Sequence, residues 1–140
     1  MDSAGLCAKD LMQRDVKTVS EKTSLREAAK IMYEGKLSSL VVERNDKGDA
    51  FGILTRKDVV AGLFALETDD MPLLVEDVMT KPAITLNPVL SIDHCLQMMR
   101  MVGVRRMPVV EANELVGIVS NTDVFRHLVE NAGLTNEADG

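Results

Sequence analysis

Two stretches of the chain, GILTRKD and GIVSNTD, contain residue types that could bind a ligand. Each places a hydroxyl residue three positions before an aspartate, and the two pairs are Thr55 with Asp58 and Ser120 with Asp123. An ionised carboxylate only accepts hydrogen bonds, so its two oxygens can take both hydroxyls of a ribose. The same spacing suits a helix cap, in which the hydroxyl accepts a backbone N–H and the acid complements the helix dipole. The spacing alone leaves both explanations open.

Two arginines precede the second stretch and are candidates for binding a phosphate. Arg105 and Arg106 stand immediately before the apolar run MPVV at 107–110. The planar guanidinium matches phosphate oxygens, and a solvated pair of surface charges is the structural alternative. Because strand alternation sends neighbouring side chains to opposite faces, we expect at most one of them to reach a ligand from a regular strand, and we favour Arg106.

The charge pattern around the first stretch is different. Ser38 and Ser39 stand at the positions of the two arginines, whereas Arg56 and Lys57 follow Thr55 and could contact a phosphate at the helix start. Asn121 and Thr122, which follow Ser120 at the same positions, carry no charge. The sequence therefore predicts two ligand sites that are not equivalent.

The two stretches close two copies of one repeat. AKDLMQRDVKTV at 8–19 matches VEDVMTKPAITL at 75–86, and KLSSLVVER at 36–44 matches GVRRMPVVE at 103–111. The offset between the copies changes along the chain, so insertions fall between the predicted elements, where loops tolerate them.

Hydrophobic periodicity predicts one helix early in each repeat. Apolar residues recur at i, i+3, i+4 and i+7, and the two sets are Leu25, Ala28, Ala29 and Met32, then Ile92, Cys95, Leu96 and Met99. We expect Gly35 and Gly103 to close these helices in a left-handed conformation.

Each repeat continues with a predicted hairpin and a second helix. The strand-like runs are 40–43 and 51–54 in the first repeat, and 107–111 and 115–119 in the second. The final helices are predicted at 56–66 and 121–130, so each repeat is roughly β-α-β-β-α and the fold class is α/β (α+β). The predicted boundaries are 8–66 for repeat 1, 67–74 for a connector, 75–130 for repeat 2 and 131–140 for a flexible tail.

Composition argues against several classes of function. A net charge of −6, with no Trp and few other aromatic residues, provides neither the basic surface nor the stacking platforms that nucleic acids need. No apolar run approaches the ~20 residues that span a bilayer, and the N-terminus lacks the pattern of a secretion signal. We expect a cytoplasmic protein with neither nucleic acid nor membrane as a partner.

No residue pattern indicates catalysis or metal binding. Cys7, His94, Cys95 and His127 lack the spacing of a metal site, and no nucleophile elbow or phosphate-binding loop is present. The sequence predicts no catalytic residue, no metal and no required cofactor, so we do not expect an enzyme.

The motifs, in this order and twice at one spacing, resemble a tandem pair of cystathionine-β-synthase (CBS) domains over about residues 8–130. The resemblance implies that the repeats pack as a pseudo-twofold pair with ligand clefts between them. It also implies a homodimer and an adenosyl ligand as effector, namely AMP, ADP, ATP, S-adenosylmethionine or NAD.

The resemblance further implies which residues bind the ligand. The ribose positions are Asp58 and Asp123, with Thr55 and Ser120 as the neighbouring hydroxyls; the phosphate pair is Arg105 and Arg106; and the positions near the adenine or its backbone contacts are Thr18, Val19, Thr85, Leu86 and Pro108. In the family each cleft draws on both repeats, so the sequence leaves open which aspartate shares a ligand with either arginine.

The predicted function is a regulatory, energy-sensing module that binds an adenine nucleotide or other adenosyl ligand and signals through a change in conformation or assembly. The final helices, 56–66 and 121–130, are expected to contribute to a homodimer, and a partner protein would receive the signal. The alternative is a CBS module that binds no ligand and serves only to dimerise and to hold a partner protein.

Overall fold

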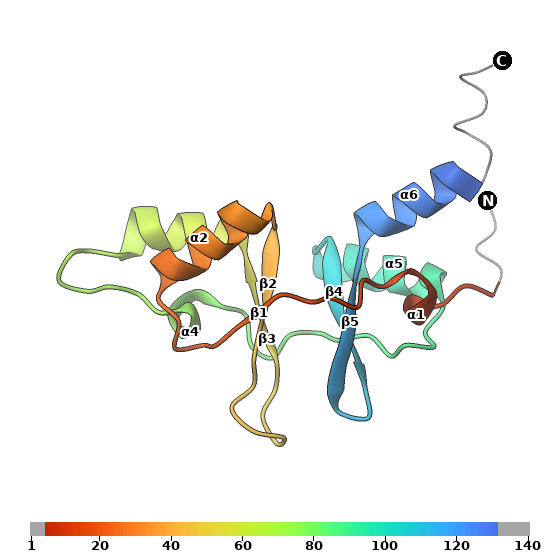
Figure 1. Ribbon diagram of the computed structural model, residues 1–140, viewed down its shortest axis with the longest axis horizontal. Coiled ribbons are helices and arrows are strands. Elements are labelled where there is room, and N and C mark those ends of the chain that lie inside the picture. The colour runs from red at the N-terminus through yellow and green to blue at the C-terminus, as the bar shows by residue number, and fades with distance from the viewer. Residues whose placement is uncertain (1–4, 132–140) are drawn as a thin grey trace, which may run out of the picture. The chain divides into compact units, whose positions relative to one another are not determined.

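The computed structural model describes residues 5–131 (Figure 1). The chain forms two compact units, of which unit 1 combines Met1–Asp15 with Ile84–Gly140 and unit 2 comprises Val16–Ala83. The mixed α/β class and the two repeats are confirmed. The predicted flexible tail, 131–140, lies outside the described residues except for Asn131.

The compact units do not coincide with the sequence repeats, because the repeats exchange their first segments. Helix α1, Ala8–Leu11, precedes the rest of repeat 1 but packs in unit 1, where Ala8 is fully buried. Helix α4, Val75–Val78, opens repeat 2 but packs in unit 2, where Val75 is fully buried. We call 8–15 and 75–83 the exchanged segments.

The two exchanged segments bind their units through equivalent backbone hydrogen bonds. In unit 1, Gln13 and Ile118 exchange N–H···O bonds of 2.8 and 2.9 Å. In unit 2, Thr80 and Ile53 exchange the same pair of bonds, both at 2.9 Å. Each exchanged segment is therefore fixed beside the second strand of a hairpin.

Unit 2 contains a three-stranded sheet in the order β1-β2-β3. The short strand β1, Thr18–Val19, runs parallel to β2, Ser39–Val42, which pairs antiparallel with β3, Gly52–Thr55. Every residue of β2 is buried, since the strand lies in the middle of the sheet. Helices α2, Leu25–Gly35, and α3, Arg56–Ala61, flank this hairpin in the chain.

Unit 1 contains the antiparallel hairpin of β4, Arg106–Glu111, and β5, Glu114–Ser120. Leu86 stands where unit 2 has β1, and it forms a single parallel bridge with Val109. Helices α5, Ile92–Val102, and α6, Asn121–Asn131, precede and follow the hairpin. The predicted order of strand, helix, strand, strand and helix is thus present in both repeats, with the first strand of repeat 2 reduced to a bridge.

Each unit has its own aliphatic core. The predicted helix stripes are buried as expected at Leu25, Ala28, Met32, Ile92, Cys95 and Met99. They pack against buried strand residues such as Leu40 and Leu54 in unit 2 and Met107 and Val119 in unit 1. The two cores thus explain why apolar periodicity alone located the first helix of each repeat.

The helix ends agree with the sequence prediction in one repeat only. Gly103 closes α5 in the left-handed region, with φ 81°, as predicted. The prediction for Gly35 was wrong, because this glycine remains helical and Lys36 takes the left-handed position, with φ 54°. A Cβ on Gly35 would lie 3.1 Å from the Leu37 side chain, so close packing explains this glycine.

The last helix of repeat 1 has two parts. After α3 the chain continues as a π-helical segment, η1, at Gly62–Leu66, so the predicted bounds of 56–66 are confirmed while its uniform α-helical character is not. A Cβ on Gly62 would lie 2.5 Å from Leu25 of α2, which explains the glycine at this close approach. No helix within residues 5–131 is long and apolar enough to cross a membrane.

Candidate functional site

In unit 1, Ser120 and Asp123 form the predicted helix start at the junction of β5 and α6. The backbone N–H of Asp123 donates to Ser120 Oγ at 3.1 Å, and Ser120 Oγ donates to Asp123 Oδ2 at 2.8 Å. Ser120 is buried, and the Asp123 side chain is only 11% exposed. The capping role expected for Ser120 is therefore confirmed.

In unit 2, Thr55 and Asp58 form a reciprocal capping box at the junction of β3 and α3. Thr55 Oγ1 accepts the Asp58 N–H at 3.2 Å, while Asp58 Oδ2 accepts the Thr55 N–H at 2.8 Å. Both residues are half-buried. The capping role expected for Thr55 is confirmed, and Asp58 is fixed in orientation by the same pair of bonds.

The second carboxylate oxygen distinguishes the two aspartates. Asp123 Oδ1 accepts from Gln13 Nε2 at 3.1 Å and from Arg126 Nη1 at 3.2 Å. Asp58 Oδ1 has no hydrogen-bond partner among residues 5–131. No motif in the sequence indicates Gln13, and its only signal is its place in the repeat, where Thr80 is the counterpart.

The two arginines lie in different environments, and the reason is that only Arg106 belongs to the strand. Arg106 opens β4 and pairs across the hairpin with Ser120, whereas Arg105 is exposed and precedes the strand. The Arg106 Nε is buried and has no hydrogen-bond partner within the described part of the chain. Arg106, Ser120 and Asp123 therefore lie at one end of the same hairpin and α6.

Ser39 occupies in unit 2 the place that Arg106 occupies in unit 1. It opens β2, pairs with Thr55 and is 7% exposed. Its Oγ is buried and, like the Arg106 Nε, has no partner among the described residues. In the sequence, Ser39 stands out only as a departure from the arginine pair. The structure thus places an unpaired polar atom at equivalent positions in both units.

The remaining predicted phosphate residues lie on the surface of unit 2. Arg56 and Lys57 are exposed in the first turn of α3. Arg56 Nη2 makes one long contact, of 3.5 Å, to the Leu37 carbonyl. The Arg56 side chain also borders a cavity of about 620 Å³ between α2 and α3 that is lined largely by apolar side chains.

The predicted adenine-side positions divide into core and surface. Val19, Leu86 and Pro108 are buried, so their side chains belong to the packing of the two units. Thr18 is half-buried, and its Oγ1 donates to Glu43 Oε1 at 2.8 Å, while Thr85 is exposed. In the pairs Thr18–Val19 and Thr85–Leu86, only the threonine is exposed enough to contact a ligand through its side chain.

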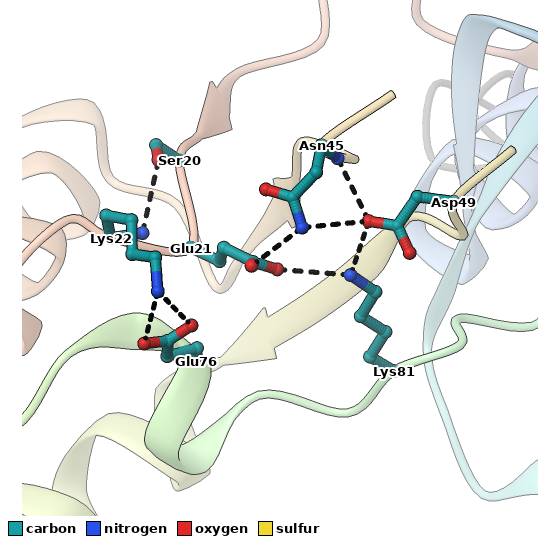
Figure 2. Close-up of polar contacts among 7 residues, drawn as sticks. All are labelled: Ser20, Glu21, Lys22, Asn45, Asp49, Glu76 and Lys81. Carbon is teal, nitrogen blue, oxygen red and sulfur yellow. Dashed lines mark hydrogen bonds and ion pairs between the residues drawn. The ribbon is translucent and has the colours of Figure 1, made fainter. Parts of the chain in front are cut away.

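A polar network holds the exchanged segment of unit 2 (Figure 2). Lys81 Nζ bonds Asp49 Oδ2 at 2.6 Å and Glu21 Oε2 at 3.1 Å, and Asn45 Nδ2 bonds both carboxylates. Lys22 Nζ adds a bond of 2.9 Å to Glu76 in the same segment. None of these bonds involves a predicted ligand-binding residue, so we assign the network to structure.

The hydrogen bonds of the network shift the pKa values of Asp49, Glu21 and Lys81. Hydrogen bonds from the Asn45 backbone and from Lys81 lower the pKa of Asp49 to about 2. Hydrogen bonds from Asn45 and then Lys81 lower the pKa of Glu21, and the bond to Asp49 raises the pKa of Lys81. All three groups are therefore charged at neutral pH. Within residues 5–131, no cluster of three His, Cys, Asp or Glu side chains could hold a metal ion.

Comparison with protein-family models matches the CBS domain twice, at residues 8–65 and 75–130. The chain belongs to the CBS domain family. It is 32% identical to the CBS domain-containing protein YhcV of Bacillus subtilis over 132 residues, which cover 91% of this chain and 92% of that protein.

Other relatives contain the CBS pair as one part of a larger protein. The chain is 39% identical over 119 residues to an inosine-5'-monophosphate dehydrogenase of Korarchaeum cryptofilum, covering 84% of this chain and 23% of the dehydrogenase. The chain thus spans about a quarter of that enzyme's length.

A solved structure of a CBS domain pair provides a ligand-bound comparison. The CBS pair of protein MJ0100, in complex with 5'-methylthioadenosine and S-adenosyl-L-methionine, superposes with a TM-score of 0.77 at 26% identity. The match covers 90% of this chain and 98% of that one. At least one CBS pair of this fold therefore binds adenosyl ligands.

Proposed function

We propose that this CBS pair is a regulatory module that binds an adenosyl ligand and acts through binding rather than catalysis, in the cytoplasm. One observation carries the proposal. Each unit has a carboxylate held in place by hydrogen bonds, Asp58 in unit 2 and Asp123 in unit 1, at the end of its hairpin. The first residue of the same hairpin, Ser39 or Arg106, has a buried polar atom without a partner among the described residues. An adenosyl ligand supplies both a diol for the carboxylate and a 5' substituent for the polar atom.

The proposed roles follow the chemistry of each unit. Asp58 and Asp123 accept the ribose hydroxyls, and Thr55 and Ser120 hold these carboxylates in place. Arg106 contacts a phosphate in unit 1, and the exposed Arg105 lies beside it. In unit 2, the exposed Arg56 and Lys57 contact the phosphate. On the adenine side, the proposed side-chain contacts come from Thr18 and Thr85, while Val19, Leu86 and Pro108, whose side chains are buried, would contribute through their backbone.

The ligand class is supported by the family and by the MJ0100 complex, which holds 5'-methylthioadenosine and S-adenosylmethionine. AMP, ADP, ATP and NAD share the adenosyl group and belong to the same proposal. Ligand binding would favour one arrangement of the protein, and a partner protein would respond to that arrangement.

We also propose that the module acts as a homodimer through its final helices. Phe64 of η1 is 89% exposed and Phe125 of α6 is 66% exposed, which is unusual for two of the three phenylalanines of the chain. Light scattering on the chain in solution measures this directly: a dimer is expected, and a monomer would contradict the proposal.

The alternative function is a structural module that binds no ligand and holds a partner protein. The intrachain contacts of Asp123 favour this alternative, because both of its oxygens already accept hydrogen bonds. Capping would then be the only role of the two aspartates.

Thermal unfolding with the adenosyl compounds separates the two functions. A ligand at 100 times its Kd adds ~2.7 kcal/mol of stability, and the midpoint should rise by roughly 5–10 °C at this chain length. Asp58→Ala and Asp123→Ala should each weaken one site about 100-fold, since two hydrogen bonds to a charged acceptor are lost.

The matched control is Asp93→Ala, which alters an exposed aspartate in the first turn of α5. It should leave ligand binding unchanged. If none of the adenosyl compounds moves the unfolding midpoint, the structural module is correct and the ligand-sensing function is not.

A further inference from the structure

We infer that Gln13 is a selectivity residue, which occupies Asp123 in the ligand-free chain and must leave it before a ribose can bind. For an adenosyl ligand without a phosphate, the Asp58 site therefore fills first. This inference rests on the proposed function and concerns the order in which its two sites are used.

The contact of Gln13 with Asp123 is made by a side chain on a fixed backbone. The Gln13 N–H and carbonyl are both bonded to Ile118, so the residue cannot drift away from the hairpin. Its side chain is exposed, and its Nε2 lies 3.1 Å from Asp123 Oδ1. An exposed amide at the end of a flexible side chain can exchange this bond for one to water at little cost.

The three side-chain donors around Asp123 leave one acceptor position of about four open, which is too few for the two hydroxyls of a vicinal diol. A ribose donates two hydrogen bonds, and a carboxylate binds it best with one hydroxyl on each oxygen or both on one edge. Oδ2 accepts from Ser120 at 2.8 Å, and Oδ1 accepts from Gln13 and Arg126. Gln13 is the donor that can leave, because Ser120 belongs to the cap and the Arg126 guanidinium offsets the charge of the carboxylate from its own helix.

The corresponding position in unit 2 lacks this donor. Thr80 makes the same backbone pair with Ile53 that Gln13 makes with Ile118, but no hydrogen bond joins its shorter side chain to Asp58 within the described residues. The two units therefore have the same backbone at this position, and the length and type of one side chain decide whether the aspartate is occupied.

The Asp123 end of unit 1 nevertheless has a feature that suits a ligand. The Arg106 Nε is buried without a partner across the hairpin from Ser120. An unpaired buried donor is costly, and an anionic group near it would offset that cost. The site is thus suited to a ligand with a phosphate and is blocked on its ribose side by Gln13.

The test measures binding of AMP and of 5'-methylthioadenosine by calorimetry in an Asp58→Ala background, where only the Asp123 site remains. Gln13→Ala should bind the probe about two- to tenfold more tightly than its parent, the range expected when one ordinary hydrogen bond no longer competes. The matched control is Gln97→Ala, which removes the other glutamine of the chain from an exposed position on α5 and should change nothing.

A second measurement follows Gln13 itself. Because the chain has two glutamines, Gln13 and Gln97, side-chain amide labelling gives two NMR signal pairs, and the Gln13→Ala spectrum assigns them. Saturating probe should shift the Gln13 pair and leave the Gln97 pair in place.

The outcomes distinguish the inference from the proposed function. If the probe binds at the Asp123 site with equal or lower affinity in Gln13→Ala, or without moving the Gln13 signals, the inference is wrong and the proposed function stands. If neither probe binds the unmodified chain or any variant, the proposed function fails and the inference fails with it.

Discussion

The exchanged segments of the two units share a backbone arrangement and differ in side-chain chemistry. Segment 75–83 is held in unit 2 by Lys81, which bonds Glu21 and Asp49 and does not contact Asp58. Segment 8–15 is held in unit 1 by Gln13, which bonds the candidate ribose carboxylate itself.

In unit 2 the side-chain contacts of the exchanged segment lie apart from the candidate ligand site, whereas in unit 1 such a contact is made to the candidate ligand residue itself. Sequence duplication has preserved the paired N–H···O bonds at Gln13 and Thr80, because they require only backbone atoms. The side chains at these two positions take no part in the backbone bonds, so they can differ between the repeats.

The largest effect is expected from Arg106→Ser, which gives unit 1 the residue type that Ser39 provides in unit 2. In an Asp58→Ala background, the preference of the Asp123 site for AMP over 5'-methylthioadenosine should fall about tenfold or more, because a charge-assisted bond to phosphate is lost. Calorimetric titration with both compounds measures the ratio.

Arg105→Ser is the control for the loss of one positive charge, since this exposed residue lies outside the strand. It should change the ratio far less than Arg106→Ser. Equal effects of the two variants would show that only the overall charge matters and that the buried Nε of Arg106 has no role.

The second prediction concerns Lys81→Met, which removes the cation of the unit 2 network. The midpoint of thermal unfolding should fall by several degrees, because the buried carboxylate of Glu21 loses its counter-charge. Gln13→Ala, which breaks the bond between exchanged segment 8–15 and Asp123 in unit 1, should leave the midpoint nearly unchanged, because an exposed amide can bond water instead.

Adding Glu21→Gln to Lys81→Met should recover part of the loss, since the more deeply buried of the two carboxylates that lost Lys81 is then neutral. A double variant less stable than Lys81→Met would contradict this explanation. In neither variant should the affinity of the Asp58 site change, because the network does not contact Thr55 or Asp58.

The third prediction is a loss of stability in acid that comes from unit 2. The folded pKa of Asp49 is about 2, below its ordinary value of 3.8, so the folded state favours the ionised form. This stabilisation is complete above about pH 4 and is lost as the pH falls toward 2. Urea midpoints near pH 6 and pH 3 should therefore differ less in Asp49→Asn than in the unmodified chain. An unchanged difference would exclude Asp49 as a source of the acid sensitivity.

Much of the fold follows from local patterns in the sequence. The stripes at Leu25–Met32 and Ile92–Met99 and the hairpin turns specify their own elements, so helices and strands could be predicted. The switch of the left-handed position from Gly35 to Lys36 could not, because it depends on the contact of Gly35 with Leu37 in three dimensions.

The exchange of segments and the partners of Asp123 required the structure. Gln13 and Asp123 are 110 positions apart, and Glu21 and Lys81 are 60 apart, so no local pattern relates either pair. The candidate ligand residues could be identified from repeated motifs, whereas the difference between the two carboxylates depends on these distant donors. The sequence likewise cannot show that the hydroxyl of Ser39 is buried without a partner opposite Thr55, because this depends on the pairing of two strands.

The smallest effect is expected from Thr80→Gln, which gives unit 2 the side chain that Gln13 provides in unit 1. With Asp123→Ala removing the other site, the new amide should compete for Asp58 and weaken binding of 5'-methylthioadenosine about two- to threefold, the lower end of what one exposed hydrogen bond contributes. Thr80→Val, which cannot donate, is the matched control and should bind as its parent does. If both variants weaken binding equally, bulk at position 80 is the cause; if Thr80→Gln has no effect, the difference between the two sites must come from Arg126, whose counterpart in repeat 1 is Ala61.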